Sequence, residues 1–321
     1  MALINNKNTI YQQLKNRLIS LFKQTTNKIS PVILNGDNLN DKQVNQLSSE
    51  IVGQDLSKAH FILANLSDAN FNGANLSGAN FSGTNLNNAN LSDANLSDAH
   101  LVGAKLNNAQ LIGTNLNNAN LSDAELVGAN LNNANLTDTN LSSANLSNAQ
   151  LINTNFNGSN LSDTNFSNAN LSNANLSDVY LWNSNFQDAQ LVGANFSSAY
   201  MNSVKLNNTN LNGANLKDAK LSDAKLKNAN LSNADFRSAD LSNANLKNAN
   251  LSNANLSNAN LEGANLQDAQ MCDANLSNAN LKNANLTDAK VEKTRFGWNQ
   301  GVSEKIKLEL KQRGAIFEDD C

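Results

Sequence analysis

A period of five residues dominates this chain and constrains what it can fold into. From Leu56 to Phe296 every fifth residue is Leu, Phe, Met or Val, without a break, which gives 49 such positions. Two residues before each stands a small residue, usually Ala. The unit Ala64-Asn65-Leu66-Ser67-Asp68 shows the pattern. An internal repeat of this kind determines the architecture before any single motif does.

A period of five fits neither a plain helix nor a plain strand, whose apolar spacings are about 3.6 and 2 residues. The small and the large residue are two apart, so both face the same side of a short extended segment. The remaining positions hold mostly Asn, Asp, Ser or Gly, which favour turns. We therefore expect a chain that turns one way after each short segment and coils on itself with its apolar side inside.

Departures from the repeat indicate how many segments complete one coil. Outward apolar residues recur at Ile112, Ile152 and Val192, at intervals of 40 residues. Tyr180 and Tyr200 are 20 residues apart. These intervals are multiples of 20 and not of 15, so they favour four sides of five residues over a three-sided coil.

The repeats resemble those of the pentapeptide-repeat family over about three quarters of the chain. The segment from Gly301 to Phe317 resembles the tail of many cyanobacterial members. The resemblance implies an all-β solenoid, a right-handed quadrilateral β-helix. With 20 residues per coil it would have about 12 coils, and the strand separation of about 4.8 Å would make it about 60 Å long.

Three regions are predicted: an N-terminal helical cap over 1–53, a pentapeptide-repeat β-helix over 54–298, and a C-terminal helical cap with an acidic tail over 299–321. Within the first region, 8–24 has the pattern of a basic amphipathic helix, which could bind a membrane surface or a partner. We favour a role in closing the first coil, because repeat stacks need caps and open sheet edges promote aggregation.

The sequence offers no recognisable chemistry. His60 and His100 are two coils apart and lie in no nucleophile or metal motif. There is no glycine-rich phosphate loop and no paired-cysteine spacing. We therefore expect no catalytic, cofactor-binding or metal-binding residues, and no enzyme. The two cysteines suit a reducing compartment, and neither a secretory signal nor a membrane-spanning stretch is evident, so a cytoplasmic location is expected.

One predicted side collects unusual outward residues. We select Tyr180, Trp182, Tyr200, His100 and Val102 as a candidate protein-binding patch, because clustered exposed aromatic residues are typical of partner sites. The alternative is sequence drift on a degenerate repeat, with Trp182 lying flat against its own wall. The sequence alone does not separate the two.

Two functions follow from these features. The first is a structural or interaction protein, a rigid rod that binds an unidentified protein partner in an unspecified oligomeric state. The second follows from family members that imitate duplex DNA and inhibit DNA gyrase. Residues 106–204 carry six acidic residues and no Lys or Arg, which is less than half the charge density of duplex DNA, about one charge per 1.7 Å. The first function is therefore favoured. The absence of a large basic face argues against direct nucleic-acid binding.

Overall fold

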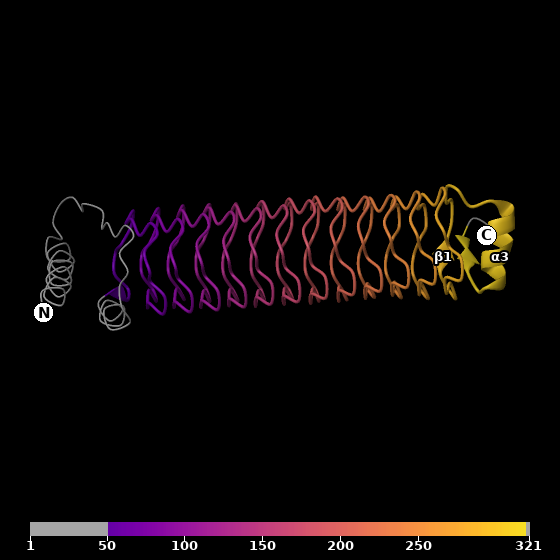
Figure 1. The fold of residues 1–321 in the computed structure, drawn as a ribbon. Helices are drawn as coiled ribbons and strands as arrows, with labels where there is room; N and C mark the ends of the chain where they lie inside the picture. Colours follow the sequence, from indigo (N-terminus) through magenta and orange to yellow (C-terminus); the bar gives the residue numbers. More distant parts are fainter. Residues whose placement is uncertain (1–50, 319–321) are drawn as a thin grey trace, which may run out of the picture.

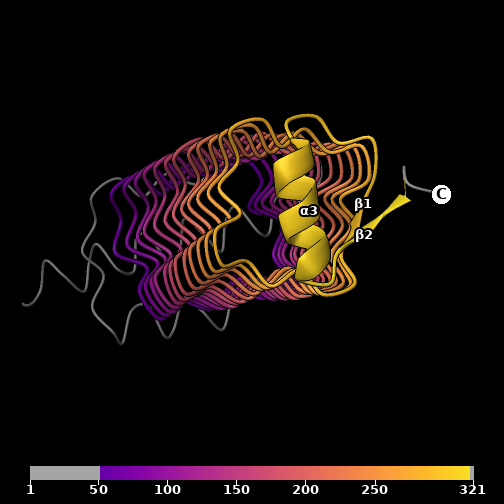
Figure 2. The same cartoon turned by 90° about the vertical axis from the view of Figure 1, so that its right-hand side faces the viewer.

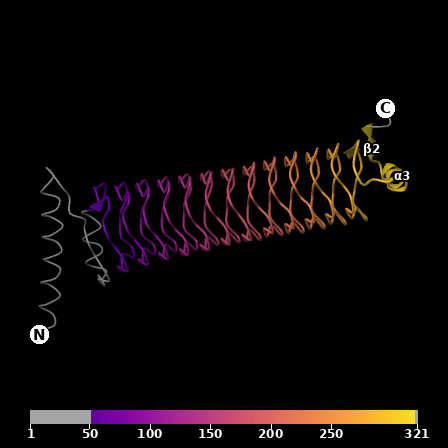
Figure 3. The ribbon, with the colours of Figure 1, turned by 90° about the horizontal axis from the view of Figure 1, so that it is seen from above.

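The structure, a computed structural model, describes residues 51–318, and Figure 1 shows them as a straight rod of stacked coils. Parallel bridges join each outward residue to the one 20 positions later, from Asp55 with Asn75 to Asn280 with Gln300. One coil therefore contains four pentapeptides, and the predicted spacing of 20 residues is confirmed. Seen from above, the rod keeps its direction along its whole length (Figure 3).

Each pentapeptide consists of one bridged residue and a tight turn. In a typical unit the Ala69 N–H donates to Leu66 O at 3.2 Å, and Asp68 has a φ of 61°. A positive φ at the third residue of the turn is the signature of a type II turn. Gly, Asn and Asp hold most of these third positions, because their side chains tolerate the left-handed conformation best.

Backbone hydrogen bonds hold consecutive coils together at every pentapeptide. Leu66 N–H donates to Asn85 O at 2.7 Å, and Asp68 N–H donates to Asn87 O at 2.9 Å. The Asn85 N–H returns a bond to Ala64 O at 2.9 Å. Because the same three bonds recur in every unit that has a coil on both sides, the wall is a continuous set of parallel ladders, although each strand is very short.

The interior is filled by the large and small residues of the repeat, as predicted. The central apolar side chains between Leu66 and Leu276 have no exposed surface. Phenylalanines of neighbouring coils stack, and the rings of Phe166 and Phe186 lie 4.7 Å apart. Where Thr replaces Ala, its hydroxyl usually donates to a turn carbonyl of the preceding coil, as Thr114 does to Leu91 O at 2.7 Å, although Thr209 donates to Leu206 O of its own turn. No buried side-chain nitrogen or oxygen within 51–318 lacks a partner.

Helix α3 crosses the C-terminal end of the rod. Strand β1, Arg295–Phe296, pairs in parallel with β2, Ile316–Phe317, and α3, Glu304–Gln312, lies between them in sequence. Figure 2 shows α3 lying across the last coil. Ser303 caps the helix by accepting from Ile306 N–H.

The helix covers only part of the last coil. Leu310 is the buried residue of α3, and the rings of Phe296 and Phe317 stack at 5.1 Å. By contrast, Ala284 and Leu286 are only partly buried, whereas Leu266, one coil earlier, is fully buried. The predicted N-terminal cap, including the helix over 8–24, lies outside the described residues apart from 51–53 and stays a prediction.

Candidate protein-binding surface

The residue before each large apolar residue faces outward and bridges its equivalents in the coils before and after it. On one side of the rod this row runs Asn160, Tyr180, Tyr200 and Lys220. Neighbours in such a row are about 4.8 Å apart along the rod, which places their side chains in register. The rings of Tyr180 and Tyr200 stack accordingly, with centroids 5.1 Å apart and planes at 12°.

Trp182 extends this stack towards the next corner. It occupies the first turn position after the buried Leu181, and its ring lies 5.6 Å from that of Tyr180 at 59°. The three rings remain accessible, with exposed fractions of 40% for Tyr180, 47% for Trp182 and 42% for Tyr200. We call Tyr180, Trp182 and Tyr200 the aromatic patch. Their mutual contacts form one continuous apolar surface.

The wall beneath Tyr180 differs from the standard repeat. Val179 occupies a small-residue position and is fully buried. Elsewhere the residue at this position donates its N–H to close the turn, as Ala199 does to Phe196 O at 3.1 Å, but no such bond joins Val179 to Leu176 within the described chain. Val204 occupies an equivalent position and keeps this bond, from its N–H to Met201 O at 3.2 Å, so the larger side chain alone does not account for the missing bond.

Carboxylates border the aromatic patch at both corners of its side. Asp178 lies two residues before Tyr180, and Asp163 N–H donates to Trp182 O at 2.8 Å. Both aspartates are exposed, and their carboxylates accept only from asparagines: Asn157 for Asp178 at 3.2 Å and Asn183 for Asp163 at 3.3 Å. Neither takes part in the ion pairs found among residues 51–318.

His100 and Val102 share this side of the rod but do not join the aromatic patch. His100 bridges Asn80 and Asn120, and its ladder then continues through Asn140 before it reaches Asn160 and Tyr180. Four coils separate His100 from Tyr180, which is about 19 Å along the rod. The structure thus gathers three of the five candidate residues and leaves the exposed His100 and the half-buried Val102 apart from them.

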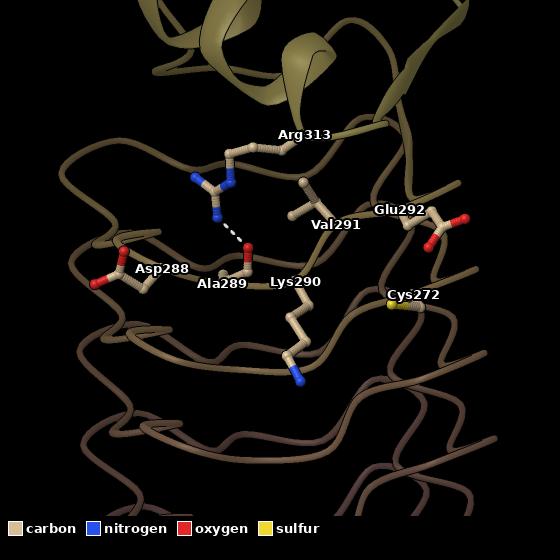
Figure 4. Close-up of a pocket in the computed structure, with 7 residues that line it drawn as sticks. All are labelled: Cys272, Asp288, Ala289, Lys290, Val291, Glu292 and Arg313. Atoms are coloured by element: carbon tan, nitrogen blue, oxygen red, sulfur yellow. Dashed lines mark hydrogen bonds between the residues drawn. The ribbon is translucent and has the colours of Figure 1, made fainter.

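A second feature, which sequence reasoning missed, is a shallow depression at the C-terminal end (Figure 4). Its lining residues are Cys272, Asp288, Ala289, Lys290, Val291, Glu292 and Arg313. The Arg313 guanidinium donates to the carbonyls of Ala289 and Leu286 and pairs with Glu309 at 3.2 Å. The charged ends of Asp288, Lys290 and Glu292 point in different directions, so the arrangement does not converge on a bound atom.

Residues 51–318 contain no group of three or more His, Cys, Asp or Glu side chains close enough to hold a metal ion. Among the same residues, no helix has the length and apolar character needed to cross a membrane. His60 is half-buried on the wall and His100 is exposed.

Two family profiles together match almost the whole repeat region. The family profile described as pentapeptide repeats (8 copies) matches residues 53–83, 74–109, 174–213, 214–253 and 254–292. A second profile, described as a pentapeptide repeat region, matches residues 99–176. None of the curated protein sequences matches the chain significantly.

Several solved structures are similar to the chain. One is HetL from the cyanobacterium Nostoc sp. strain PCC 7120, a pentapeptide repeat protein involved in heterocyst differentiation regulation. It is 30% identical to this chain, the alignment covers 80% of this chain and 96% of HetL, and the TM-score is 0.33. Another pentapeptide repeat protein from Nostoc PCC 7120, alr5209, is 30% identical over 39% of this chain and 84% of its own, with a TM-score of 0.27. QnrB1, a plasmid-mediated fluoroquinolone resistance protein, is 18% identical over 67% of this chain and 94% of its own, with a TM-score of 0.32.

Proposed function

Because the chain belongs to the pentapeptide-repeat family, whose fold is a right-handed quadrilateral β-helix, we propose that it is a non-enzymatic structural and interaction protein. In this proposal the rod binds another protein through the aromatic patch. The observation that carries the proposal is the exposure of Tyr180, Trp182 and Tyr200 as one contacting cluster on a wall otherwise made mostly of Asn, Ser and Asp.

Aromatic side chains of this kind suit protein recognition. Tyr and Trp are enriched among the residues that dominate binding energy, because each buries a large apolar area and keeps a polar group for hydrogen bonding. The backbone under the patch is fixed by ladder bonds, such as Tyr180 N–H to Ser159 O at 3.0 Å and Tyr200 N–H to Val179 O at 2.9 Å. A surface that is already ordered loses little entropy when a partner binds.

Imitation of DNA is less well supported by the surface. Most ladder positions hold Asn, whose side chains bond to one another, as Asn165 does to Asn145 at 3.1 Å. A neutral amide ladder does not present the dense negative charge that a DNA-binding surface recognises. We therefore do not extend the proposal to the inhibition or protection of DNA gyrase.

The proposal is tested with the triple variant Tyr180→Asn, Trp182→Ser, Tyr200→Asn. These substitutions restore the consensus, in which Ser162 N–H donates to Asn160 Oδ1 at 3.1 Å, so folding should survive. Tagged full chains are used for affinity capture from the cells of origin, and the captured proteins are quantified by mass spectrometry. Proteins retained by the wild type should be lost from the triple variant.

A matched control on the same side of the rod is His100→Asn with Val102→Ser, which also restores the consensus. Because these residues lie about four coils, or 19 Å, from the aromatic patch, the control should retain the wild-type partners. If the triple variant captures the same proteins in the same amounts as the wild type, the aromatic patch is not the docking site and the proposal is wrong.

A further inference from the structure

The charge around the aromatic patch restricts the partner that it fits. Between Lys105 and Lys205 the chain contains no Lys or Arg, while it carries Asp123, Glu125, Asp138, Asp163, Asp178 and Asp188. The patch lies within this acidic stretch. A partner segment that crosses the patch at Tyr180 and Trp182 therefore meets negative charge, and the nearest cation of the same row is Lys220, beyond Tyr200. Electrostatic complementarity favours a basic segment there.

Two of these carboxylates stand where they would reach a side chain stacked on the rings. Asp178 precedes Tyr180 at one corner of the side, and Asp163 lies beside Asn183 at the corner that follows Trp182. Each is exposed and forms no ion pair within the described chain. The two carboxylates therefore provide hydrogen-bond acceptors on both edges of the aromatic patch.

Arginine is the side chain that can contact an aromatic ring and a carboxylate at the same time. Its planar guanidinium stacks on the face of Tyr or Trp and donates two parallel hydrogen bonds to a carboxylate, whereas the ammonium of Lys is a compact, strongly hydrated charge. A ring beside a carboxylate therefore discriminates between the two cations. The backbone bond from Asp163 N–H to Trp182 O, and the two-residue spacing of Asp178 and Tyr180, place these carboxylate positions next to the positions of the two rings.

The row of outward residues that contains Tyr180 and Tyr200 also determines where along the rod a positive group of a partner is favoured. Tyr200 bridges Lys220 in the following coil, so a cation of the rod stands at the C-terminal edge of the stack. In the other direction the row continues through Asn160 and Asn140, and the nearest charges are the carboxylates already named. Positive groups of a partner are thus favoured over the N-terminal part of the patch and disfavoured beyond Tyr200.

We propose that the aromatic patch binds an arginine-bearing basic segment of a partner protein, with guanidinium groups stacked on Tyr180 and Trp182 and paired with Asp178 and Asp163. This inference rests on the proposed function, since it names the partner chemistry of the same surface. It adds that the interaction selects arginine over lysine and weakens as salt screens the two aspartates.

Three labelled peptides test the proposal against the full chain by fluorescence anisotropy. Each has six repeats of a dipeptide: Arg-Gly, Lys-Gly or Gln-Gly. The Arg-Gly peptide should bind most tightly, the Lys-Gly peptide more weakly, and the Gln-Gly peptide not measurably. Raising the salt concentration should weaken binding of the Arg-Gly peptide.

Variants connect this preference to the named residues. Asp163→Asn with Asp178→Asn should weaken binding of the Arg-Gly peptide about two- to thirtyfold, as expected for two exposed ion pairs. The matched control Asp93→Asn with Asp98→Asn removes the same charge several coils away, beyond the screening length of about 10 Å, and should change binding little. The aromatic triple variant should lose the preference for Arg-Gly over Lys-Gly.

Other outcomes overturn the inference. Equal binding of the Arg-Gly and Lys-Gly peptides, or equal weakening by the two aspartate variants, would show general charge attraction instead of an arginine site. A peptide of residues 7–28, which contains five Lys or Arg and no Asp or Glu, is tested in parallel. If it binds the patch and Arg-Gly does not, the occupant is the chain's own N-terminal segment.

The experiments separate this inference from the proposed function. If the aromatic triple variant loses its partners in the capture experiment but Arg-Gly does not bind the wild type, the docking surface stands and the assignment of arginine is wrong. If the triple variant keeps its partners, the proposed function fails, whatever the peptides do.

Discussion

The side-chain amide of Asn195 donates to Oδ1 of Asn175, one coil earlier, at 3.0 Å. The same oxygen accepts the N–H of Ser177 at 3.3 Å and so closes a turn within its own coil. One amide oxygen therefore serves both the local turn and the contact between coils. This dual role explains why Asn dominates the ladders, since Asp lacks the donor and Ser lacks the reach.

Removing one member of this ladder should destabilise the rod. Asn195 Oδ1 also accepts from Ser197 N–H at 3.2 Å and from Asn215 Nδ2 at 2.9 Å. Asn195→Ala loses these bonds and should cost about 1–3 kcal/mol, at about 1 kcal/mol for each bond. The measurement is urea unfolding. Ser252→Ala is the control, because Ser252 keeps its backbone bond to Asn250 and should change stability by less than about 0.5 kcal/mol.

The interior should be far more sensitive than the wall. Leu136 has no exposed surface, and Leu136→Ala should cost about 2–5 kcal/mol through lost burial and the cavity left behind. Its neighbour Thr137 is half-buried and accepts from Asn117 Nδ2 through its hydroxyl at 2.7 Å. Thr137→Ser keeps that hydroxyl and should cost little. Comparable shifts in the unfolding midpoint for both variants would contradict the inward and outward assignment.

The turns predict a substitution that stabilises the rod. Leu63 occupies the third turn position with a φ of 57° and is 66% exposed. A left-handed conformation costs an ordinary residue about 1–2 kcal/mol, and Asn tolerates it better. Leu63→Asn should therefore raise the melting temperature. The reverse change at an equivalent position, Asn88→Leu, should lower it, since Asn88 has a φ of 59°. The argument fails if Leu63→Asn melts below the wild type.

Local patterns in the sequence were enough to predict much of this structure. The alternation of Ala and Leu determines which side chains are buried, and the interval of 20 residues between Tyr180 and Tyr200 indicates how many residues form one coil. Ser303 is recognisable as a helix cap because capping depends on residues close in sequence. These features are encoded within one or two repeats, so they do not depend on how distant parts meet.

Features that depend on distant contacts could not be predicted in the same way. The position of Arg313 on the carbonyls of Leu286 and Ala289 depends on how α3 lies across the last coil, and no local pattern specifies it. The predicted patch included both His100 and Tyr180 because they share one side of the rod, but they are four coils apart along it. Residues on one side touch only when their coils are adjacent.

The last prediction concerns the C-terminal segment. Deleting residues 303–321 removes Phe317, which stacks on Phe296, and the β2 strand that pairs with β1. It also removes the bonds from Ile316 N–H to Thr294 O at 2.9 Å and from Lys293 N–H to Gly314 O at 2.8 Å. The truncated rod then presents apolar side chains and an unpaired sheet edge, which promotes edge-to-edge association.

We therefore expect the truncated chain to melt at a lower temperature and to show a molar mass by light scattering that rises with concentration. The matched control is Leu308→Ser, because Leu308 is an exposed residue of α3 and its replacement leaves Phe296 and β1 covered. This variant should behave as the wild type does. A truncated chain with the mass and melting temperature of the full chain would show that α3 and β2 do not protect the end of the rod.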